Sequence, residues 1–393
     1  MTSSRTASLL ILALLIGACS STASTGEPNS SSTTTDSEDP GGAPAAGTDS
    51  VGTETMFEVG RPDLNPTGNR VVEGVGALTA DPVVIPLPGT PVLVVPVTGD
   101  ENLWAVELES GQQLVVDETG IVDDAVRFSP DFAPATPVDD PLPDARAVRS
   151  AAPQGTPTVE AVLVQPTDRY GHGVLGDKFE ADAIAVTVDG QTTTFSPTDG
   201  SVIEGLSPIL ADVDGDGTVE ILATVSNADA GARLAFYALD GTPIAASDPI
   251  GRGGRWRNQL GIGPVGPNGE TEIVDVHTPH LGRTIEFFQL NGDRLQLVAS
   301  VQGFTSHVAG SRNLDLGIIA DGDGDGTLDV IAPTGDLRTI GIISRTPEGA
   351  EVAAIIELDG ELTTNIGARS YNGTVDFAVG TNTGNLLLWP GQG

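Results

Sequence analysis

The sequence is poor in cysteine and in positive charge. Cys19 is its single cysteine, so no disulfide can form within the chain. There are 18 lysine and arginine residues against 54 aspartate and glutamate residues, which gives a formal net charge of −36. A nucleic-acid-binding protein needs a basic face for the phosphates, and electrostatic docking on anionic lipid needs a basic segment. The charge therefore argues against nucleic acid as a partner and against purely electrostatic membrane binding.

The sequence also lacks the short motifs of the common enzyme classes. It contains no nucleophile elbow, no phosphate-binding loop, no dinucleotide fingerprint and no histidine-paired cysteine. These absences favour a binding or scaffold protein over an enzyme, and they leave catalysis open.

Glycine and proline are abundant. The 393 residues include 50 glycines and 28 prolines, and 39% of the chain is hydrophobic. Such a composition suits many short strands and turns and fits long helices poorly. Because the hydrophobic fraction is large enough for a packed core, the composition predicts an all-β fold over most of the chain.

Residues 1–19 have the pattern of an export signal. An apolar run at residues 7–16 is too short to span a bilayer and has the length of a signal-peptide core. It leads into Gly17-Ala18-Cys19, which resembles the cleavage box of bacterial lipoproteins. We predict a signal peptide at residues 1–18 and a lipid on the thiol of Cys19. The alternative is an ordinary secretory signal with an incidental cysteine.

The next segment has a different composition. Residues 19–55 are rich in serine, threonine, glycine and proline, are acidic, and show no apolar periodicity. Such a segment cannot bury enough surface to offset its ordering entropy, so we expect a disordered tether. The folded domain is then expected at residues 56–393, held by the lipid at the extracytoplasmic side of the cell membrane.

Two acidic nonapeptides are the strongest motif in the chain, and each precedes a run of apolar residues. Carboxylates at positions 1, 3, 5 and 9 converge on one point, glycine at position 6 permits the turn, and the carbonyl at position 7 points inward. This many hard oxygen ligands select Ca²⁺. The predicted ligands of two calcium ions are Asp212, Asp214, Asp216, Thr218 and Glu220 in the first loop and Asp321, Asp323, Asp325, Thr327 and Asp329 in the second.

An EF-hand shares the start of this spacing. It also needs a bidentate glutamate at position 12 and a helix on each side. Position 12 is Ala223 in the first loop and Ala332 in the second, and strand-type residues follow both loops. Each loop is therefore expected to join two strands. The alternative is a pair of acidic turns that bind no metal.

On these residues the chain resembles the FG-GAP/VCBS repeat family, whose propeller blades carry Asp-x-Asp-x-Asp-Gly-x-x-Asp calcium loops, as in the integrin α-subunit head. The resemblance is specific at residues 208–225 and 317–333 and weaker over roughly 165–393. It implies a β-propeller of four-stranded blades, with the calcium loops between the first and second strands of a blade.

Degenerate copies of the loop support a repeat. Their ninth positions are Glu272 and Asp376, and neither copy keeps enough acids to hold a metal. At about 48 residues a blade, the folded part predicts seven blades. Six is the alternative, because residues 117–165 are poorly patterned. Since the chain ends after a third-strand pattern, a strand from residues 70–98 is expected to complete the last blade.

The connections on the rim opposite the calcium loops are rich in arginine and histidine, and this placement is what the resemblance implies. A local excess of positive charge on an acidic chain favours an anionic small molecule or an acidic glycan, with a protein partner as the other candidate. The candidate ligand-binding residues are Arg255, Trp256, Arg257, His277, His280, Arg283, His307, Arg312 and Asn313.

Two other interpretations of this rim stay open. The arginines can instead pair with carboxylates of neighbouring blades, such as Asp315 and Asp336. Alternatively, the protein is an enzyme that cleaves acidic polysaccharide by β-elimination, with His280 as the base and Arg257 and Arg312 as charge neutralisers. That enzyme would require a histidine and at least two arginines in one pocket.

Overall fold

The computed structural model describes residues 67–97, 99–100, 102–124, 126, 133–150 and 157–391. All of them belong to the compact unit that begins at Thr53. The predicted signal peptide, Cys19 and the predicted tether lie outside these ranges. The described residues form twenty-five strands and no helix, so none of their segments is a helix long and apolar enough to cross a bilayer.

Most of the strands form consecutive antiparallel groups of four. Single pairings, Ala181 with Ile203 and Ala246 with Arg294, link the second, third and fourth groups into one sheet. The first four groups are β3 (Pro91–Pro96), β4 (Trp104–Leu108), β5 (Gln113–Asp117) and β6 (Gly120–Asp123); β7 (Val148–Arg149), β8 (Val159–Thr167), β9 (Glu180–Val188) and β10 (Gln191–Phe195); β11 (Val202–Ala211), β12 (Glu220–Asn227), β13 (Gly231–Tyr237) and β14 (Pro243–Ala246); and β15 (Arg257–Gly263), β16 (Glu272–His277), β17 (Thr284–Asn291) and β18 (Arg294–Gln302). We call these groups blades 1 to 4.

Two further blades follow. Blade 5 contains β19 (Ile318–Ala320), β20 (Asp329–Pro333), β21 (Thr339–Thr346) and β22 (Gly349–Glu357), and blade 6 contains β23 (Gly367–Tyr371), β24 (Thr374–Gly380), β25 (Asn385–Trp389) and β2 (Val83–Pro86). The remaining strand, β1 (Val71–Val72), lies parallel to β19. Repeated four-stranded antiparallel sheets of this kind make a β-propeller.

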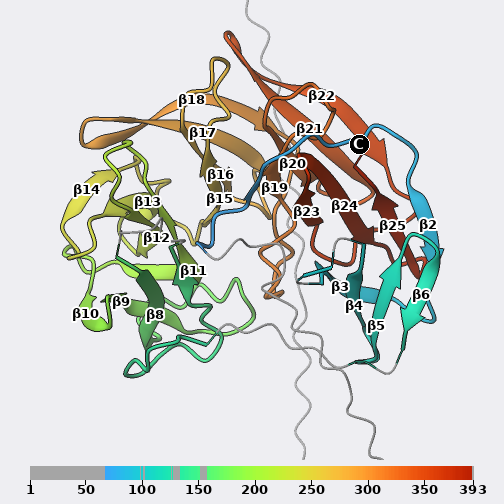
Figure 1. Cartoon of the computed structure of the whole chain (residues 1–393). Helices are drawn as coiled ribbons and strands as arrows, with labels where there is room; N and C mark the ends of the chain where they lie inside the picture. The colour runs from blue at the N-terminus through green and yellow to red at the C-terminus, as the bar shows by residue number, and fades with distance from the viewer. Residues whose placement is uncertain are drawn as a thin grey trace, which may run out of the picture. The chain divides into compact units, whose positions relative to one another are not determined.

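An N-terminal strand completes the last blade, as the sequence predicted. Val83 pairs with Leu388 and Pro86 with Asn385, which makes β2 the outer strand of blade 6. Figure 1 shows β2, in blue, beside β25, in dark red. A strand from one end of the domain thus joins a sheet from the other end and covers its free edge.

The described ranges supply strands for six blades, the alternative count, and not for the seventh. The expected seventh blade relied on residues 117–165. In their described parts these residues contain the last residue of β5, the short strands β6 and β7, and most of β8. Part of this stretch packs along β8 without becoming a regular strand, with Leu142 N–H donating to the Leu163 carbonyl at 3.1 Å.

Apolar clusters join consecutive blades. Ile184 and Ile221 belong to a cluster between blades 2 and 3, and Phe236 and Phe288 to one between blades 3 and 4. Similar clusters join blades 4 and 5, 5 and 6, and 6 and 1. The blades are therefore held together by side chains that alternate between the two faces of each sheet.

Alternate connections lie at opposite ends of an antiparallel sheet. We call the end with the first-to-second-strand connections, including 212–219 and 321–328, the acidic rim. The opposite rim carries residues 168–179, 247–256, 278–283 and 303–317. These opposite-rim connections touch one another, as when Gly310 N–H donates to the Val174 carbonyl at 2.9 Å.

Candidate functional site

The first acidic loop brings three predicted ligands together. Atoms of Asp212, Asp214 and Glu220 lie within 4.8 Å of one another. Both oxygens of Asp212 accept backbone N–H groups of the loop, at 2.7 Å from Gly215 and 2.9 Å from Gly217. The backbone thus wraps around the first carboxylate. Asp216 and Thr218 lie in the same loop but outside this group of three carboxylates.

The second acidic loop also brings three acids together, but at positions 1, 3 and 5 of the loop, whereas the first loop uses positions 1, 3 and 9. Atoms of Asp321, Asp323 and Asp325 lie within 4.8 Å of one another. Asp321 is only 1% exposed, and it accepts the N–H groups of Gly324 at 2.7 Å and Gly326 at 2.9 Å. Asp329, at the ninth position, is buried and accepts Gly322 N–H at 3.0 Å. Thr327 N–H donates to Asp325 at 2.8 Å.

Crowding of these acids disfavours their ionised forms. Burial, followed by the negative charges of the neighbouring aspartates, raises the pKa of Glu220 to about 7. Burial likewise raises the pKa of Asp329 to about 6, with Asp323 and Asp325 adding to the effect. A divalent cation at either loop would favour the ionised carboxylates.

In the degenerate copies of the loop, the acid at the ninth position pairs with an arginine. Glu272, at the ninth position of one copy, binds Arg345 through both carboxylate oxygens, at 2.8 and 3.1 Å. Asp376, at the ninth position of the other, pairs with Arg369. Where the loop has lost its other acids, a guanidinium therefore neutralises the ninth residue. In the described residues, Glu220 and Asp329 have no basic partner within salt-bridge distance.

The difference between the complete and the degenerate loops shows whether the residues present suit a bound cation. Both complete loops keep clustered carboxylates without an arginine, and hard oxygen donors in this number suit Ca²⁺ better than a transition metal. The residues present therefore fit calcium at both loops.

Most arginines of the opposite rim are paired with acids. The pairs are Arg252 with Asp229, Arg312 with Asp144 and Asp177, and Arg338 with Glu361. Two further arginines lie in strands: Arg257, at the start of β15, pairs with Asp275 and Glu286, and Arg369, within β23, pairs with Asp376. Arg255 is exposed, and among the described residues its side chain donates only to the Ile250 carbonyl, at 3.3 Å.

Arg257 is the centre of a buried ionic cluster on blade 4. Its Nη1 lies 2.8 Å from Asp275 and 2.6 Å from Glu286, and His277 Nδ1 lies 3.0 Å from the other oxygen of Glu286. Burial raises the pKa of Asp275 to about 6 against the opposing effect of Arg257. Two of the predicted ligand-binding residues, Arg257 and His277, are thus paired with carboxylates of their own blade.

Two of the four histidines, His280 and His307, pack against Trp256. His307 Nε2 must donate to the Ser311 carbonyl at 2.7 Å, so a neutral His307 accepts at Nδ1 from His280 Nε2, also at 2.7 Å. Burial lowers the pKa of His307 to about 4 and lowers the pKa of His280. Both rings are therefore neutral near pH 7, and they pack against Trp256 with ring centroids 5.2 and 6.3 Å away.

His172, which the sequence did not single out, has the opposite behaviour. Its Nδ1 lies 2.7 Å from buried Glu204. Burial opposes the charge on the ring, and the Glu204 carboxylate outweighs it and raises the pKa of His172. The sequence could not predict this pair, because Glu204 lies 32 residues away in β11 of the next blade.

The tryptophans pack inside the fold. Trp104, Trp256 and Trp389 are each at most 3% exposed, so the ring of Trp256 is not available at the surface as a stacking platform. Asn258 donates to Ser306 Oγ at 2.8 Å, and Asn313 accepts from Asp315 N–H at 3.0 Å. Arg283 lies across Gly335, so close that a Cβ at residue 335 would overlap its guanidinium.

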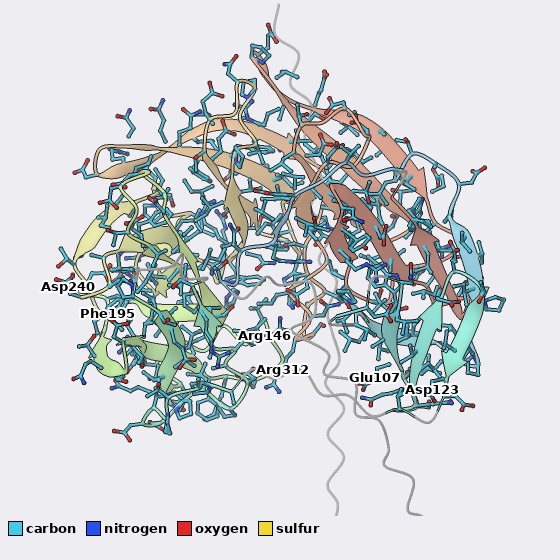
Figure 2. All side chains as sticks on the ribbon, viewed as in Figure 1. Glu107, Asp123, Arg146, Phe195, Asp240 and Arg312 are labelled. Carbon is cyan, nitrogen blue, oxygen red and sulfur yellow. The ribbon has the colours of Figure 1, made fainter. Side chains whose placement is uncertain are left out.

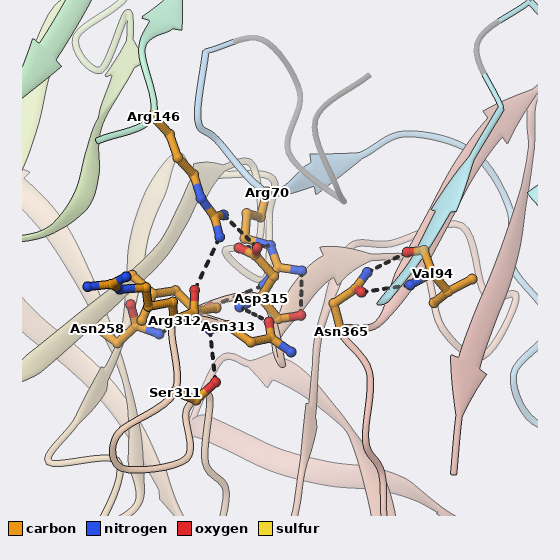
Figure 3. A network of polar contacts seen from close by, with 10 residues as sticks. Arg70, Val94, Arg146, Asn258, Ser311, Arg312, Asn313, Asp315 and Asn365 are labelled. Atoms are coloured by element: carbon orange, nitrogen blue, oxygen red, sulfur yellow. Dashed lines mark hydrogen bonds and ion pairs between the residues drawn. The ribbon is translucent and has the colours of Figure 1, made fainter. Parts of the chain in front are cut away.

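Asp315 pairs with two arginines that the sequence did not connect to it (Figure 3). Arg146 Nη1 lies 2.7 Å from its carboxylate, and Arg70 donates to its backbone carbonyl at 2.9 Å. Arg146 also donates to the Arg312 carbonyl at 3.2 Å, and Figure 2 shows these two residues close together. The connection 303–317 is therefore fixed from two sides, and Asp315 does not pair with the rim arginines named above.

Two cavities among the described residues reach this region. One touches Arg70, Arg146, Trp256 and Asp315, and the other touches His172, Arg255, Trp256 and His280. Each has a volume of about 30 Å³, which holds about two water molecules. Neither of these two cavities is large enough to enclose a sugar ring.

Comparison with known proteins adds no family assignment. No family model and no curated protein matches the sequence, so the likeness to FG-GAP/VCBS repeats stays a prediction. Among solved structures, BBS1N in complex with ARL6DN is 11% identical, with 77% of this chain and 78% of that chain covered and a TM-score of 0.36. The Dos1 propeller is 9% identical, with 76% and 67% covered and a TM-score of 0.37. The propeller assignment rests on the strand pairing described above.

Replacing Arg257 by leucine tests the ionic cluster of blade 4. The substitution leaves Asp275 and Glu286 buried without a cation, so we expect a loss of about 3–5 kcal/mol in the free energy of unfolding. The loss should be smaller at pH 5 than at pH 8, because protonation removes the uncompensated charge. Urea denaturation at the two pH values measures it.

The matched control is Arg252→Leu. Arg252 and Asp229 form an exposed pair, so this variant should change stability by no more than about 0.5 kcal/mol. Equal stability of the Arg257 and Arg252 variants at pH 8 would contradict the role given to Arg257.

Proposed function

We propose that this chain is an exported, lipid-anchored β-propeller of six blades that binds two calcium ions and acts as a binding or scaffold module. The observation that carries the calcium part is the fate of the ninth loop residue. Within the part of the chain that the structure describes, arginine pairs with this residue where the loop is degenerate, and none does where the loop is complete. Calcium then supplies the positive charge that Arg345 and Arg369 supply elsewhere.

Chelation tests the calcium sites. An ion that binds only the folded state at 100 times its Kd adds about 2.7 kcal/mol of stability, so EDTA should lower the melting temperature. The effect should be larger at pH 8 than at pH 5. Without calcium, Glu220 and Asp329 keep protons in the folded state between about pH 4 and pH 7 that the unfolded chain releases, so stability falls as the pH rises through this window.

Variants assign the effect to the loops. The double variant Asp214→Asn/Asp323→Asn should lose the response to EDTA, and Glu270→Gln, in the degenerate loop of blade 4, should keep it. Elemental analysis should find two calcium ions per chain. An unchanged melting temperature in EDTA, with no bound calcium, would reject both sites.

The lipid anchor is carried by the sequence around Cys19. Cys19→Ser removes the thiol that takes the lipid, so the variant should lose fatty-acid label and leave the membrane fraction. Metabolic labelling with an alkyne fatty acid, followed by fractionation of the cells, measures both. Wild-type protein without label would show an ordinary secretory signal, and a Cys19→Ser protein that keeps the label would place the lipid elsewhere.

For the opposite rim we propose an anionic ligand, such as an acidic glycan, that binds at Arg255. Arg255 is exposed and bonds only to a carbonyl, whereas the other arginines of the predicted site have acids or neighbouring loops around them. The cavity at His280 contains one arginine, which does not meet the requirement of the lyase alternative. A binding role therefore has more support than catalysis.

Binding of polygalacturonate tests this site. Removing one charge-assisted hydrogen bond costs about 1.5–3 kcal/mol, so Arg255→Ala should weaken binding at least about tenfold in calorimetry. Arg338→Ala removes an equally exposed arginine that pairs with Glu361, and it should bind as the wild type does. Equal weakening by both variants, or no binding by the wild type, would reject Arg255 as the site.

A further inference from the structure

Residues 71–86 join the inner part of the domain to its last blade, and we call them the closing segment. The segment starts as β1 beside β19, continues past the turn between β23 and β24, and ends as β2 in blade 6. Val75 N–H donates to the Gly373 carbonyl at 2.9 Å on the way. Near its middle, the Ala80 carbonyl accepts the indole N–H of Trp389 at 3.0 Å.

The middle of the closing segment lies directly on the second acidic loop. Leu78 N–H donates to the Gly322 carbonyl at 3.0 Å. Gly76 approaches so closely that a Cβ there would lie 2.1 Å from the Asp321 carbonyl oxygen, and a Cβ on Gly324 would lie 3.1 Å from the Gly76 carbonyl oxygen. The loop backbone is therefore the support on which residues 76–78 rest.

Apolar packing adds to this contact. Leu78 is 1% exposed and belongs to the cluster that joins blades 5 and 6, together with Ile331 and Phe377. If the second acidic loop moved, the Gly322 carbonyl that accepts Leu78 N–H would move with it. The side chain of Leu78 would then lose its packing in the cluster between blades 5 and 6. The position of the loop and the docking of the closing segment are thus coupled through Leu78.

The first acidic loop has no such neighbour. Asp212, Asp214 and Asp216 are exposed, and in the described residues no backbone hydrogen bond joins 212–219 to the closing segment. The two loops share a sequence pattern, but the closing segment packs only against the second loop in the described residues. The first loop is therefore a control for the second.

We infer that calcium at the second loop, and not at the first, locks the closing segment onto blade 6. The inference rests on the proposed calcium sites. Without a cation, the carboxylates of Asp321, Asp323 and Asp325 lie within 4.8 Å and repel one another. Calcium removes that repulsion and fixes the Asp321–Gly322 backbone, which holds Gly76 and Leu78. Extracellular calcium modules bind in the 10⁻⁴–10⁻³ M range, so an exported protein would complete this lock outside the cell.

Hydrogen exchange of the whole purified protein, followed by mass spectrometry of its peptides, tests the lock. EDTA should speed exchange in peptides that cover residues 76–88 and 385–391 at least about tenfold, because local opening exposes their amides. Peptides from β12 and β13 in blade 3 should change less. In calcium, Asp323→Asn should reproduce the effect of EDTA on the closing segment, and Asp214→Asn should leave its exchange as in the wild type.

The outcomes separate the inference from the calcium proposal. Two bound calcium ions with unchanged exchange in the closing segment would overturn the lock and leave the calcium sites standing. Equal acceleration by Asp214→Asn, or uniform acceleration over all blades in EDTA, would also overturn it. No bound calcium would overturn both proposals. If Asp323→Asn fails to fold, a calcium titration of the wild type gives the same comparison between the closing segment and blade 3.

Discussion

Burial of both faces of every blade is the constraint on which the rest of the structure depends. In β20, Val330 faces the cluster shared with blade 4, and Ile331 faces the one shared with blade 6. Neither residue is exposed, so an isolated blade would present two apolar faces to water. The blades are consequently stable only together, and the strand that completes the last blade matters to all of them.

The acid at the ninth position of each loop lies in one of two settings, with an arginine beside it or with other carboxylates beside it. A buried carboxylate at the start of the second strand needs a positive charge nearby. Glu272 and Asp376 have a guanidinium from their own or the next blade, with fixed geometry and no dependence on solution conditions. Glu220 and Asp329 have carboxylate neighbours instead, and burial together with these neighbours raises the pKa of both acids.

Local patterns in the sequence predicted local structure well. The acidic nonapeptides join strands, as residues 212–219 between β11 and β12 show, and the N-terminal strand completes blade 6. Pairings between distant segments could not be predicted. Asn69 bonds both backbone groups of Ile262, and Arg70 reaches Asp315 across 245 residues. No periodicity marks such pairs, so the sequence overestimated the free charge of the opposite rim.

The charge ratio explains that overestimate. The chain has 54 acids and 18 bases, three acids for each base, so an arginine placed on any surface meets a carboxylate before it meets a ligand. A cluster of arginines in such a chain indicates a place where blades are joined by ion pairs, as Arg312 joins Asp144 and Asp177. An anion site in an acidic protein is therefore better sought at an arginine whose neighbours are carbonyl groups. On the opposite rim that residue is Arg255, which lines the same small cavity as the rings of His280 and His172.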